Sequence, residues 1–401
     1  MEFKDFNFSE ELYDGLSAMG FKQPTPIQQQ AIPAVMEKKD LIACAQTGTG
    51  KTAAFLLPVM DDIIRQASDN ISTLIIVPTR ELAVQIDQQL EGFSYFTPIS
   101  SIAVYGGGDG NTFNREKAAL TQGADIIIAT PGRIITHLNL GYVNFGNLRH
   151  LILDEADRML DMGFFDDLMK IVRQLPEKRQ TLLFSATMPP KIRQLAEKIL
   201  HDPFRIDIAI SKPAEGLFHA AFSVYDHQKL DLVTHLISAK PLPSIIIFCS
   251  TKANVKRINK SLKKLKFRSE EIHSDLEQEE REDVLRRFRN RELQILVATD
   301  ILSRGIDIES ISLIINYDVP PDAEDYIHRI GRTARAETTG IAFTFINESE
   351  QSKFKRIEKL IGHEIRKVKL PAHIGEGPVY NPRPLKNGHK KRTYKKKKRS
   401  K

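Results

Sequence analysis

The chain has 401 residues, of which 41% are hydrophobic and 27% charged, with a formal net charge of +7. This composition indicates a soluble globular protein of about two domains with extensions. No apolar run approaches the ~20 residues that cross a membrane, and the first residues lack the basic and apolar regions of a secretory signal. The two cysteines, Cys44 and Cys249, have no metal-binding spacing. We expect buried, inert thiols in a reducing cytoplasm.

The first predicted strand, Leu41–Cys44, leads directly into a glycine-rich segment and then a helix. Such a loop curls until several backbone N–H groups face a polyphosphate, and the helix N-terminus adds positive potential. Lys51 would reach the outer phosphates and the Thr52 hydroxyl would ligate Mg²⁺. A glycine turn ahead of an ordinary helix is the alternative, and it does not explain the full pattern. We predict a nucleoside triphosphate site at Ala45, Gln46, Thr47, Gly48, Thr49, Gly50, Lys51 and Thr52.

Apolar strand candidates alternate with helical patterns between residues 40 and 210. This alternation predicts an α/β fold with a parallel sheet covered on both faces. Proline-containing stretches near residues 203 and 213 interrupt the pattern, and a second series of strands follows, which predicts a second domain. The strand candidates are 73–77, 125–129, 148–153 and 180–184 in the first series, and 244–248, 294–298 and 311–315 in the second.

The strand at 148–153 ends in Asp154-Glu155-Ala156-Asp157. Ligands of open α/β sheets bind at the carboxyl ends of strands, so these acids and the phosphate loop should share one edge. We predict that Asp154 binds Mg²⁺ through water, because Mg²⁺ loses its hydration shell reluctantly. Glu155 would orient or deprotonate the attacking water. A preference for acids at a helix start explains part of this pattern, but not two acids at the end of this strand.

Together with the phosphate loop, Asp-Glu-Ala-Asp resembles the DEAD-box family of RNA-dependent ATPases in helicase superfamily two, from about Phe3 to about residue 370. The resemblance implies two tandem RecA-like domains, with ATP and Mg²⁺ as cofactors and RNA as partner. The compact core with its short basic end resembles small bacterial members, particularly the RhlE-type subgroup. We expect an adenine-recognition segment at 1–30, an ATP-binding domain at 31–210, a linker at 211–218, a helicase C-terminal domain at 219–370, and a Pro/Gly linker with a disordered Lys/Arg-rich tail at 371–401.

Upstream of the phosphate loop, residues 20–28 resemble the family's Q motif, with Phe3 at the place of its upstream aromatic. By similarity, Phe21 stacks on adenine and Gln28 hydrogen-bonds the adenine edge, with Thr25 in the same pocket. A carboxamide offers a donor and an acceptor to one base edge, which agrees with this role. Taken alone, Phe21 would be core packing and Gln28 a surface amide.

The second domain resembles the half of a helicase that completes the ATP site from outside. Residues 328–335 contain three arginines, and the resemblance implies that Arg332 and Arg335 contact the terminal phosphate. Guanidinium groups suit this role because they stay charged and bind phosphate bidentately. Asp307 would lie on the ribose or phosphate side. The family usually has glycine where this chain has Ala334, so alanine would strain the loop if that backbone position needed a positive φ.

The resemblance also implies residues that couple ATP to domain closure. Ser185 and Thr187 end a first-domain strand and would link the acidic segment to the closed state through hydroxyl hydrogen bonds. Asp157 and His328 belong to the same coupling set. Short Ser/Thr turns are also common as helix caps, so Ser185 and Thr187 alone would be a weak signal.

Two further strand ends, at 78–82 and 130–133, have the chemistry of a helix start beside an arginine, which suits backbone phosphates. Thr130 is predicted to cap its helix, with Pro131 at the first helical position. Residues 108–111 depart from the common family pattern. Sequence-independent contacts to one nucleic-acid strand are therefore expected at Pro78, Thr79, Arg80, Gly106, Gly107, Thr130, Gly132 and Arg133. The family resemblance implies that this strand is RNA and that it is also contacted by Thr251, Arg281, Thr299 and Arg304.

The positive charge is local. Residues 383–401 contain eleven Lys or Arg and no acid, and removing these charges from +7 leaves −4 for residues 1–382. Such a tail cannot bury enough apolar surface to fold alone, and attraction to nucleic-acid phosphates is its expected use. A solubilising tail and a nuclear import signal are the alternatives. Before it, an amphipathic helix is predicted at 351–369, and the fold is expected to end at Pro371.

The predicted function is RNA-dependent ATP hydrolysis in which closure of the two domains locally unwinds short duplexes or remodels RNA–protein complexes. The protein is expected to be monomeric. A DNA helicase shares the paired domains, but Asp157 and the adenine-selecting segment favour the RNA family. A non-unwinding RNA clamp is a second alternative. A small-molecule kinase would leave residues 220–370 unexplained.

Overall fold

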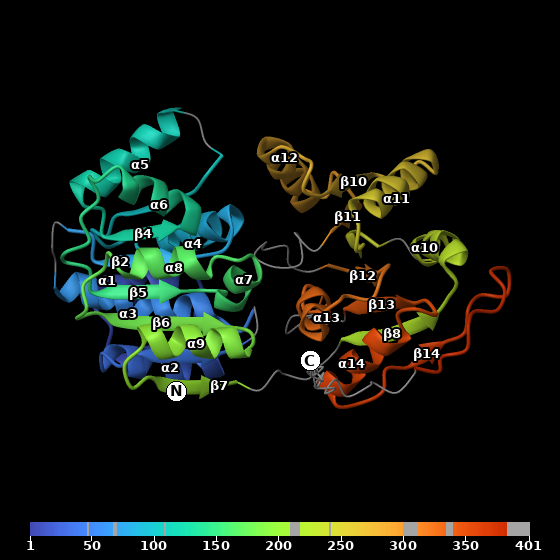
Figure 1. Cartoon of the computed structure of the whole chain (residues 1–401), viewed down its shortest axis with the longest axis horizontal. Helices are drawn as coiled ribbons and strands as arrows, with labels where there is room; N and C mark the ends of the chain where they lie inside the picture. Colours follow the sequence, from blue (N-terminus) through green and yellow to red (C-terminus); the bar gives the residue numbers. More distant parts are fainter. Residues whose placement is uncertain are drawn as a thin grey trace, which may run out of the picture.

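The computed structural model describes residues 1–45, 48–66, 70–107, 110–208, 217–239, 242–299, 311–333 and 340–382. They form two domains side by side, each built on a seven-stranded sheet (Figure 1). Every strand pairing in both sheets is parallel. The predicted fold class, two tandem parallel-sheet α/β domains, is confirmed.

The first domain follows the order β3-β4-β2-β5-β6-β1-β7. Its strands are β1 (Leu41–Cys44), β2 (Thr73–Ile76), β3 (Ser101–Val104), β4 (Ile126–Ala129), β5 (His150–Leu153), β6 (Gln180–Ser185) and β7 (Phe204–Asp207). Its helices are η1 (Phe3–Phe6), α1 (Glu10–Ala18), α2 (Pro26–Met36), α3 (Lys51–Arg65), α4 (Arg80–Phe93), α5 (Gly110–Gln122), α6 (Pro131–Asn139), α7 (Ala156–Asp161), α8 (Phe165–Val172) and α9 (Pro190–Ile199).

The second domain follows the order β10-β11-β9-β12-β13-β8-β14. Its strands are β8 (Phe218–Ser223), β9 (Ile245–Phe248), β10 (Ser269–Ile272), β11 (Ile295–Ala298), β12 (Leu313–Asn316), β13 (Ile341–Ile346) and β14 (Lys367–Val368). Its helices are η2 (Asp226–Gln228), α10 (Lys229–Ser238), α11 (Lys252–Lys264), α12 (Gln278–Arg289), α13 (Ala323–Ile330) and α14 (Gln351–Ile361). Counted from its own first strand, each domain has the same strand order.

Successive side chains of each strand point to opposite faces, so each sheet has two hydrophobic cores. In β1, Leu41 and Ala43 pack under helices α1–α4, whereas Ile42 packs under α5–α9. In the second domain, α12–α14 cover one face and α10–α11 the other. The central strands, such as β4, β9 and β11, are buried on both faces and are apolar runs without alternation, which is why the sequence shows them clearly. The edge strands β7 and β10 are partly exposed and contain charged residues.

The parallel register places the loops of the predicted site at one edge of each sheet. In Figure 1, β7 runs toward the second domain, and the other strands of the first sheet are parallel to it. The segments that follow β1, β2, β4, β5 and β6 therefore all leave the sheet at the edge that faces the second domain. These segments contain most of the first-domain residues that are predicted to bind ATP, hydrolyse it or contact RNA.

The helix expected at 351–369 is shorter than predicted. It ends at Ile361, because Gly362 adopts a left-handed conformation with φ of 83°, a common way to stop a helix. The chain then returns to the sheet as β14, where Lys367 and Val368 pair with β8. The apolar spacing therefore described only the first part of this segment.

The expectation that the fold ends at Pro371 is wrong, because residues 371–382 pack on the second domain. The Gln228 amide donates to the carbonyls of Ile374 (2.9 Å) and Glu376 (3.1 Å). The Tyr380 hydroxyl donates to Glu358 at 2.9 Å. A Cβ added at Gly377 would lie 2.0 Å from the carbonyl oxygen of Ser223. The glycines and prolines here fit a close backbone contact and not a free linker.

Candidate functional site

The described residues of the predicted phosphate loop lie between the end of β1 and the first turn of α3, as the sequence predicts. Gly48 and Gly50 adopt positive φ values of 83° and 89°, which lets the chain turn sharply into the helix. Lys51 is the first residue of α3 and is only 5% exposed. Its ammonium group is buried without a hydrogen-bond partner in the described part of the chain. Thr52 follows in the first turn, half-buried, and Gln46 and Thr47 lie outside the described residues.

The segment predicted to recognise adenine is hydrogen-bonded to this loop. Gln28 donates from its amide to the carbonyl of Gly50 at 3.0 Å and accepts from the backbone N–H of Thr25 at 2.8 Å. A carboxamide has two N–H donors and two acceptor lone pairs, so one of each remains for a ligand. Phe21 is half-buried and lies edge-on to Phe3 and Phe93, at 5.9 and 5.3 Å between ring centroids.

The acidic pair lies at the end of β5, as predicted. Asp154 is 3% and Glu155 5% exposed. Burial raises the pKa of Asp154 to about 6, with Lys51 opposing the shift and Glu155 adding to it. Glu155 has a left-handed φ of 51°, which is strained for a residue with a Cβ. Its carboxylate lies 3.3 Å from the Arg158 guanidinium.

The Asp157–Thr187 contact joins the strand ends of β5 and β6. Asp157 accepts hydrogen bonds from the backbone N–H and the hydroxyl of Thr187, both at 3.1 Å. The Ser185 hydroxyl donates to the carbonyl of Thr187 at 2.7 Å. Ala45 donates its N–H to the carbonyl of Ser185 at 3.0 Å, so the phosphate loop belongs to the same bonded set.

The described residues of the second domain that are predicted to act lie at the end of α13 and directly after β9 and β11. Arg332 follows α13, and its carbonyl accepts from the N–H of Ile311 at 3.3 Å. The side chain of His328, and all of Arg335, Ala334, Arg304 and Asp307, lie outside the described residues. Arg329, for which the sequence predicts no role, is fully buried. Its guanidinium donates to the Asn316 amide at 3.2 Å.

The first-domain residues predicted to contact RNA gather at the ends of β2, β3 and β4, where Pro78 and Gly132 also lie. Thr79 caps α4, since its hydroxyl accepts from the N–H of Leu82 at 3.4 Å. Thr130 occupies the cap position of α6 with Pro131 next to it, but its hydroxyl makes no capping hydrogen bond. Gly107 has a φ of 90°, and a Cβ there would lie 3.5 Å from the Arg80 guanidinium. Gly106 and Gly132 have open space on their Cβ side.

In the second domain, the Thr251 hydroxyl caps α11 by accepting from the N–H of Asn254 at 3.2 Å. Arg281 donates to the carbonyl of Ser274 at 3.1 Å. Thr299 follows β11, and its hydroxyl is buried without a hydrogen-bond partner in the described part of the chain.

An ion pair joins the two domains at the predicted RNA residues. Arg80, on α4, lies 2.8 Å from Glu282 on α12, and its guanidinium stacks 4.5 Å from the ring centre of Tyr105. Beside this pair, α4 and α12 enclose a cavity of about 750 Å³ that also contacts Leu285 and Arg289. The charged contact between Arg80 and Glu282 was not foreseen, since Glu282 lies among charged residues that resemble a solvated helix face.

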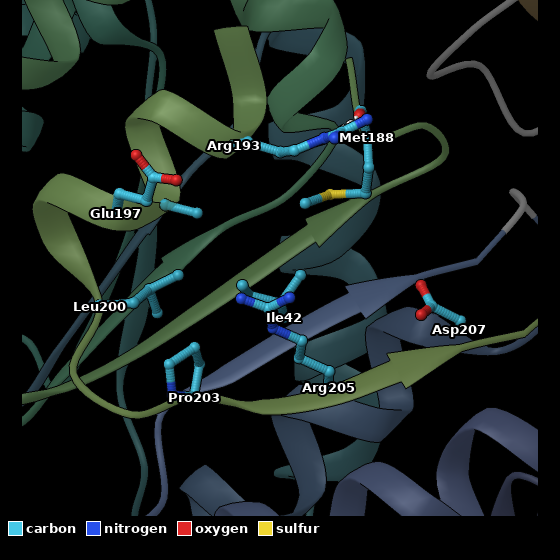
Figure 2. Close-up of a pocket in the computed structure, with 9 residues that line it drawn as sticks. Ile42, Met188, Arg193, Glu197, Leu200, Pro203, Arg205 and Asp207 are labelled. Atoms are coloured by element: carbon cyan, nitrogen blue, oxygen red, sulfur yellow. Dashed lines mark hydrogen bonds between the residues drawn. The ribbon is translucent and has the colours of Figure 1, made fainter. Parts of the chain in front are cut away.

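A second cavity, of about 400 Å³, lies between α9 and the strands β1 and β7. In Figure 2, Arg193 and Glu197 of α9 face Arg205 of β7 across Ile42. Arg193 also donates to the carbonyl of Met188 at 3.0 Å. The residues that line this cavity include none of those predicted to bind ATP or RNA.

The two cysteines are not alike. Cys249 is fully buried, as expected, and burial strongly raises the pKa of its thiol. Cys44 is half-buried and its thiol donates to the carbonyl of Ala186 at 3.3 Å. Within the described ranges, no three His, Cys, Asp or Glu side chains gather to form a metal cluster. No helix of the described chain is long and apolar enough to span a bilayer.

Two family models match the chain: the DEAD/DEAH box helicase model at residues 25–195 and the helicase conserved C-terminal domain at residues 228–337. The chain is 40% identical over 371 residues to the ATP-dependent RNA helicase CshA of Listeria monocytogenes, covering 92% of this chain and 71% of that protein. It is 38% identical to the ATP-dependent RNA helicase DbpA of Bacillus subtilis, over 92% of this chain and 77% of that protein.

Among solved structures, Saccharomyces cerevisiae Dbp5 bound to RNA and ADP BeF3 matches with a TM-score of 0.81 and 30% identity, over 91% of this chain and 95% of that one. A DEAD box protein from Methanococcus jannaschii matches with 36% identity but a TM-score of 0.54, over 92% of this chain and 99% of that one. The arrangement of this chain is thus more similar to the Dbp5 complex than to the protein with the higher sequence identity.

Proposed function

This chain belongs to the DEAD-box family of ATP-dependent RNA helicases, and we propose from this membership how its residues carry out the reaction. It is an RNA-dependent ATPase whose two domains close on ATP and RNA, and closure locally unwinds short RNA duplexes or remodels RNA–protein complexes. Stacking is worth about 1.4 kcal/mol per base-pair step in DNA, so releasing a few pairs costs several kcal/mol. One closure event therefore suits short duplexes and not long processive unwinding.

The single observation that supports the proposed ATP site is the buried ammonium of Lys51, which has no hydrogen-bond partner among the described residues. A buried charge without a partner is costly, and here it follows two positive-φ glycines at a helix N-terminus. A polyphosphate would be the missing partner of the Lys51 ammonium, and its oxygens would accept hydrogen bonds from the backbone N–H groups of the loop. In this proposal Phe21 and Gln28 hold adenine, and Arg332 with Arg335 reaches the terminal phosphate from the second domain.

The donor set also fits Mg²⁺. Asp154 is a buried carboxyl whose pKa is raised to about 6, so a nearby cation would favour its ionised form. We propose that Asp154, through water, and the Thr52 hydroxyl hold the ion, with phosphate oxygens and water as its other ligands. The bound ion would supply charge neutralisation on the phosphates. Glu155 orients the attacking water and takes its proton.

RNA is proposed to cross both domains along Arg80, the Gly106–Gly107 turn, Arg133, Thr251 and Arg281. These contacts are to backbone groups, which position a strand without reading its sequence. The Asp157–Thr187 hydrogen bonds would transmit the state of the ATP site to this track. We further propose a monomer, a cytoplasmic location consistent with its two free thiols, and a tail that binds nucleic acid. The RhlE-type subgroup also stays a prediction.

The test is ATP turnover by the purified chain with and without RNA, followed by matched RNA and DNA duplexes in a strand-release assay. We expect RNA to stimulate turnover, and short RNA duplexes to be released in preference to DNA. Equal turnover with and without RNA would contradict the proposal. ATP-dependent RNA binding with negligible strand release would instead indicate a clamp.

The role of Glu155 is tested by Glu155→Gln. We expect turnover to fall by ~10²–10⁴-fold, the usual contribution of a general base, while ATP and RNA still bind together. The glutamine side chain keeps the size of the original and removes only its charge and basicity. Binding is measured with a fluorescent ATP analogue and a labelled RNA strand. Normal RNA-stimulated turnover in this variant would refute the assignment.

A further inference from the structure

Glu116 is a buried carboxylate in the middle of α5. Its sequence neighbours are Arg115 and Lys117, which suggest a solvated helix face, yet Glu116 is only 1% exposed. Burying a charge is costly unless it is paired and hydrogen-bonded. The partners of this carboxylate therefore indicate what keeps it in the interior.

Each oxygen of this carboxylate serves a different segment. Oε1 accepts the backbone N–H of Tyr105 at 3.1 Å. Oε2 accepts a hydrogen bond from Nε of Arg133 at 2.7 Å, and Nη2 of the same guanidinium lies 2.6 Å from Oε2 as an ion pair. Oε2 also lies 2.9 Å from Nε2 of His137, a fully buried ring. One carboxylate thus binds the turn after β3 and the first and second turns of α6.

Both segments carry residues proposed to contact RNA. Tyr105 immediately precedes the Gly106–Gly107 turn, and Arg133 lies in the first turn of α6, after Thr130. Strands β3 and β4 pair with each other, so the two segments leave the sheet as neighbours. The N–H of Thr130 also donates to the carbonyl of Val104 at 3.1 Å. Glu116 is the side chain that joins the two segments above the sheet edge.

The surroundings hold this arrangement in place. The Phe113 ring stacks on His137, at 4.8 Å between centroids and 17° between planes, and the Arg133 guanidinium lies 4.9 Å from the centre of the same ring. The second ring nitrogen of His137 contacts the Tyr142 hydroxyl. The side chain of Arg133 is consequently only 16% exposed. An arginine held in this way loses little further rotamer freedom when it binds a phosphate.

We propose that Glu116 is a positioning residue for RNA: it holds Arg133 and the Tyr105–Gly107 turn in one geometry, so the first domain presents a preformed phosphate track. This inference rests on the proposed RNA contacts of those segments. Glu116 does not touch RNA itself, because it is buried. Its role is to set where the guanidinium and the glycine turn lie before the strand arrives.

A purely structural role is the competing explanation, and Asp62 offers a matched control. It is a buried carboxylate of α3 bonded to the buried ring of His150 at 2.8 Å and lying 3.2 Å from the Arg149 guanidinium. His150 begins β5, so this cluster lies at the opposite edge of the same sheet. If Glu116 only stabilises the domain, Glu116→Gln and Asp62→Asn should act alike.

The experiment measures RNA-stimulated ATP turnover by the full chain, with the KM for RNA, the KM for ATP and kcat determined separately. Glu116→Gln keeps an acceptor for Tyr105 but loses the charged partner of Arg133. We expect the KM for RNA to rise about tenfold, as loss of one charge-assisted contact would give, with the KM for ATP unchanged. The salt slope of RNA binding should fall by roughly 0.7, the single-strand value for one phosphate contact. Asp62→Asn should leave the KM for RNA within about twofold of that of the unmodified chain, and the salt slope of RNA binding unchanged.

A double-mutant cycle with Arg133→Ala connects the effect to the guanidinium. The double variant should bind RNA no more weakly than Arg133→Ala alone, because Glu116 acts through Arg133. Additive effects would overturn the proposal, and so would an equal rise in the KM for RNA in Asp62→Asn. An unchanged KM for RNA in Arg133→Ala would refute the proposed RNA contact of Arg133, and with it the role of Glu116. It would leave the proposed ATP site unaffected. Glu116→Asp keeps the negative charge but places it one methylene further from Arg133. This variant should fold and give a KM for RNA between those of the unmodified chain and Glu116→Gln. A KM for RNA equal to that of the unmodified chain would also overturn the proposal.

Discussion

The two domains have the same strand order, and each places a buried lysine at the same topological position. Lys51 begins α3 after β1, and Lys229 begins α10 after the equivalent strand β8. The two side chains are 5% and 1% exposed. An aspartate also follows the equivalent strands β5 and β12 in both domains, as Asp154 and Asp318. What differs is the partner of the lysine.

Lys229 is neutralised within its own domain. Its ammonium lies 3.1 Å from Asp318, 3.2 Å from Asp226 and 3.5 Å from Glu350. Burial opposes its charge, but Glu350 and Asp318 outweigh burial and raise the pKa of Lys229. Lys51, in contrast, has no hydrogen-bond partner in the described chain. The same topology thus holds the lysine of the proposed ATP site in one domain and the lysine of an internal ion-pair network in the other.

The largest expected effect is on Lys51. Changing it to alanine should lower ATP turnover by on the order of 10³-fold or more, because a preorganised charge on the phosphates is lost. The free energy of unfolding should hardly change, since the Lys51 ammonium has no hydrogen-bond partner to lose among the described residues. Turnover and denaturant unfolding of the same preparation check both parts. A strongly destabilised Lys51→Ala would remove the contrast with Lys229.

Arg332 tests whether the second domain completes the site of the first. Arg332→Ala should reduce turnover by ~10³-fold, at the low end for an arginine finger, and leave ATP binding by the first domain nearly unchanged. ATP affinity and turnover are measured on one preparation. Arg289→Ala, at an exposed arginine of α12, is the control and should retain ATP turnover. Unimpaired ATP turnover in Arg332→Ala would refute the proposed participation of Arg332, from the second domain, in ATP hydrolysis.

Lys229→Met should act on stability. It leaves the buried carboxylates of Asp318 and Glu350 without their cation, and breaking a buried ion pair in this way costs about 3–5 kcal/mol. The change is measured as the free energy of unfolding in urea, with Lys51→Met as the matched variant in the first domain. Similar small losses in both variants would show that the two lysines are equivalent after all.

The smallest effect concerns the tail. Deleting residues 383–401 should weaken RNA binding mainly at low salt and flatten its salt dependence, because counterion release scales with the number of phosphates contacted. Turnover at saturating RNA should not change. RNA affinity measured across a salt series checks this expectation. An unchanged slope would exclude nucleic acid as the partner of the tail.

Local backbone chemistry made much of this molecule predictable. The glycine loop, the acids at the end of β5 and the apolar strands depend on neighbours in sequence, so the order of residues alone indicates them. The contact between Asp157 and Thr187 was also expected, although through resemblance to a family and not from spacing.

Tertiary structure decided the rest. Glu116 and Glu282 lie among charged residues in sequence, and only packing against other helices gives them partners. The sequence around Gly377 has the composition of a linker. In the structure, however, it packs against the carbonyl of Ser223, which is more than a hundred residues away in sequence. Whether a buried lysine binds a ligand or its own domain depends on carboxylates brought from distant strands. The sequence indicates where a phosphate could bind. The fold determines whether a buried lysine is paired within its own domain, as Lys229 is, or is available to a ligand, as proposed for Lys51, because burial and distance set the energy of a charge.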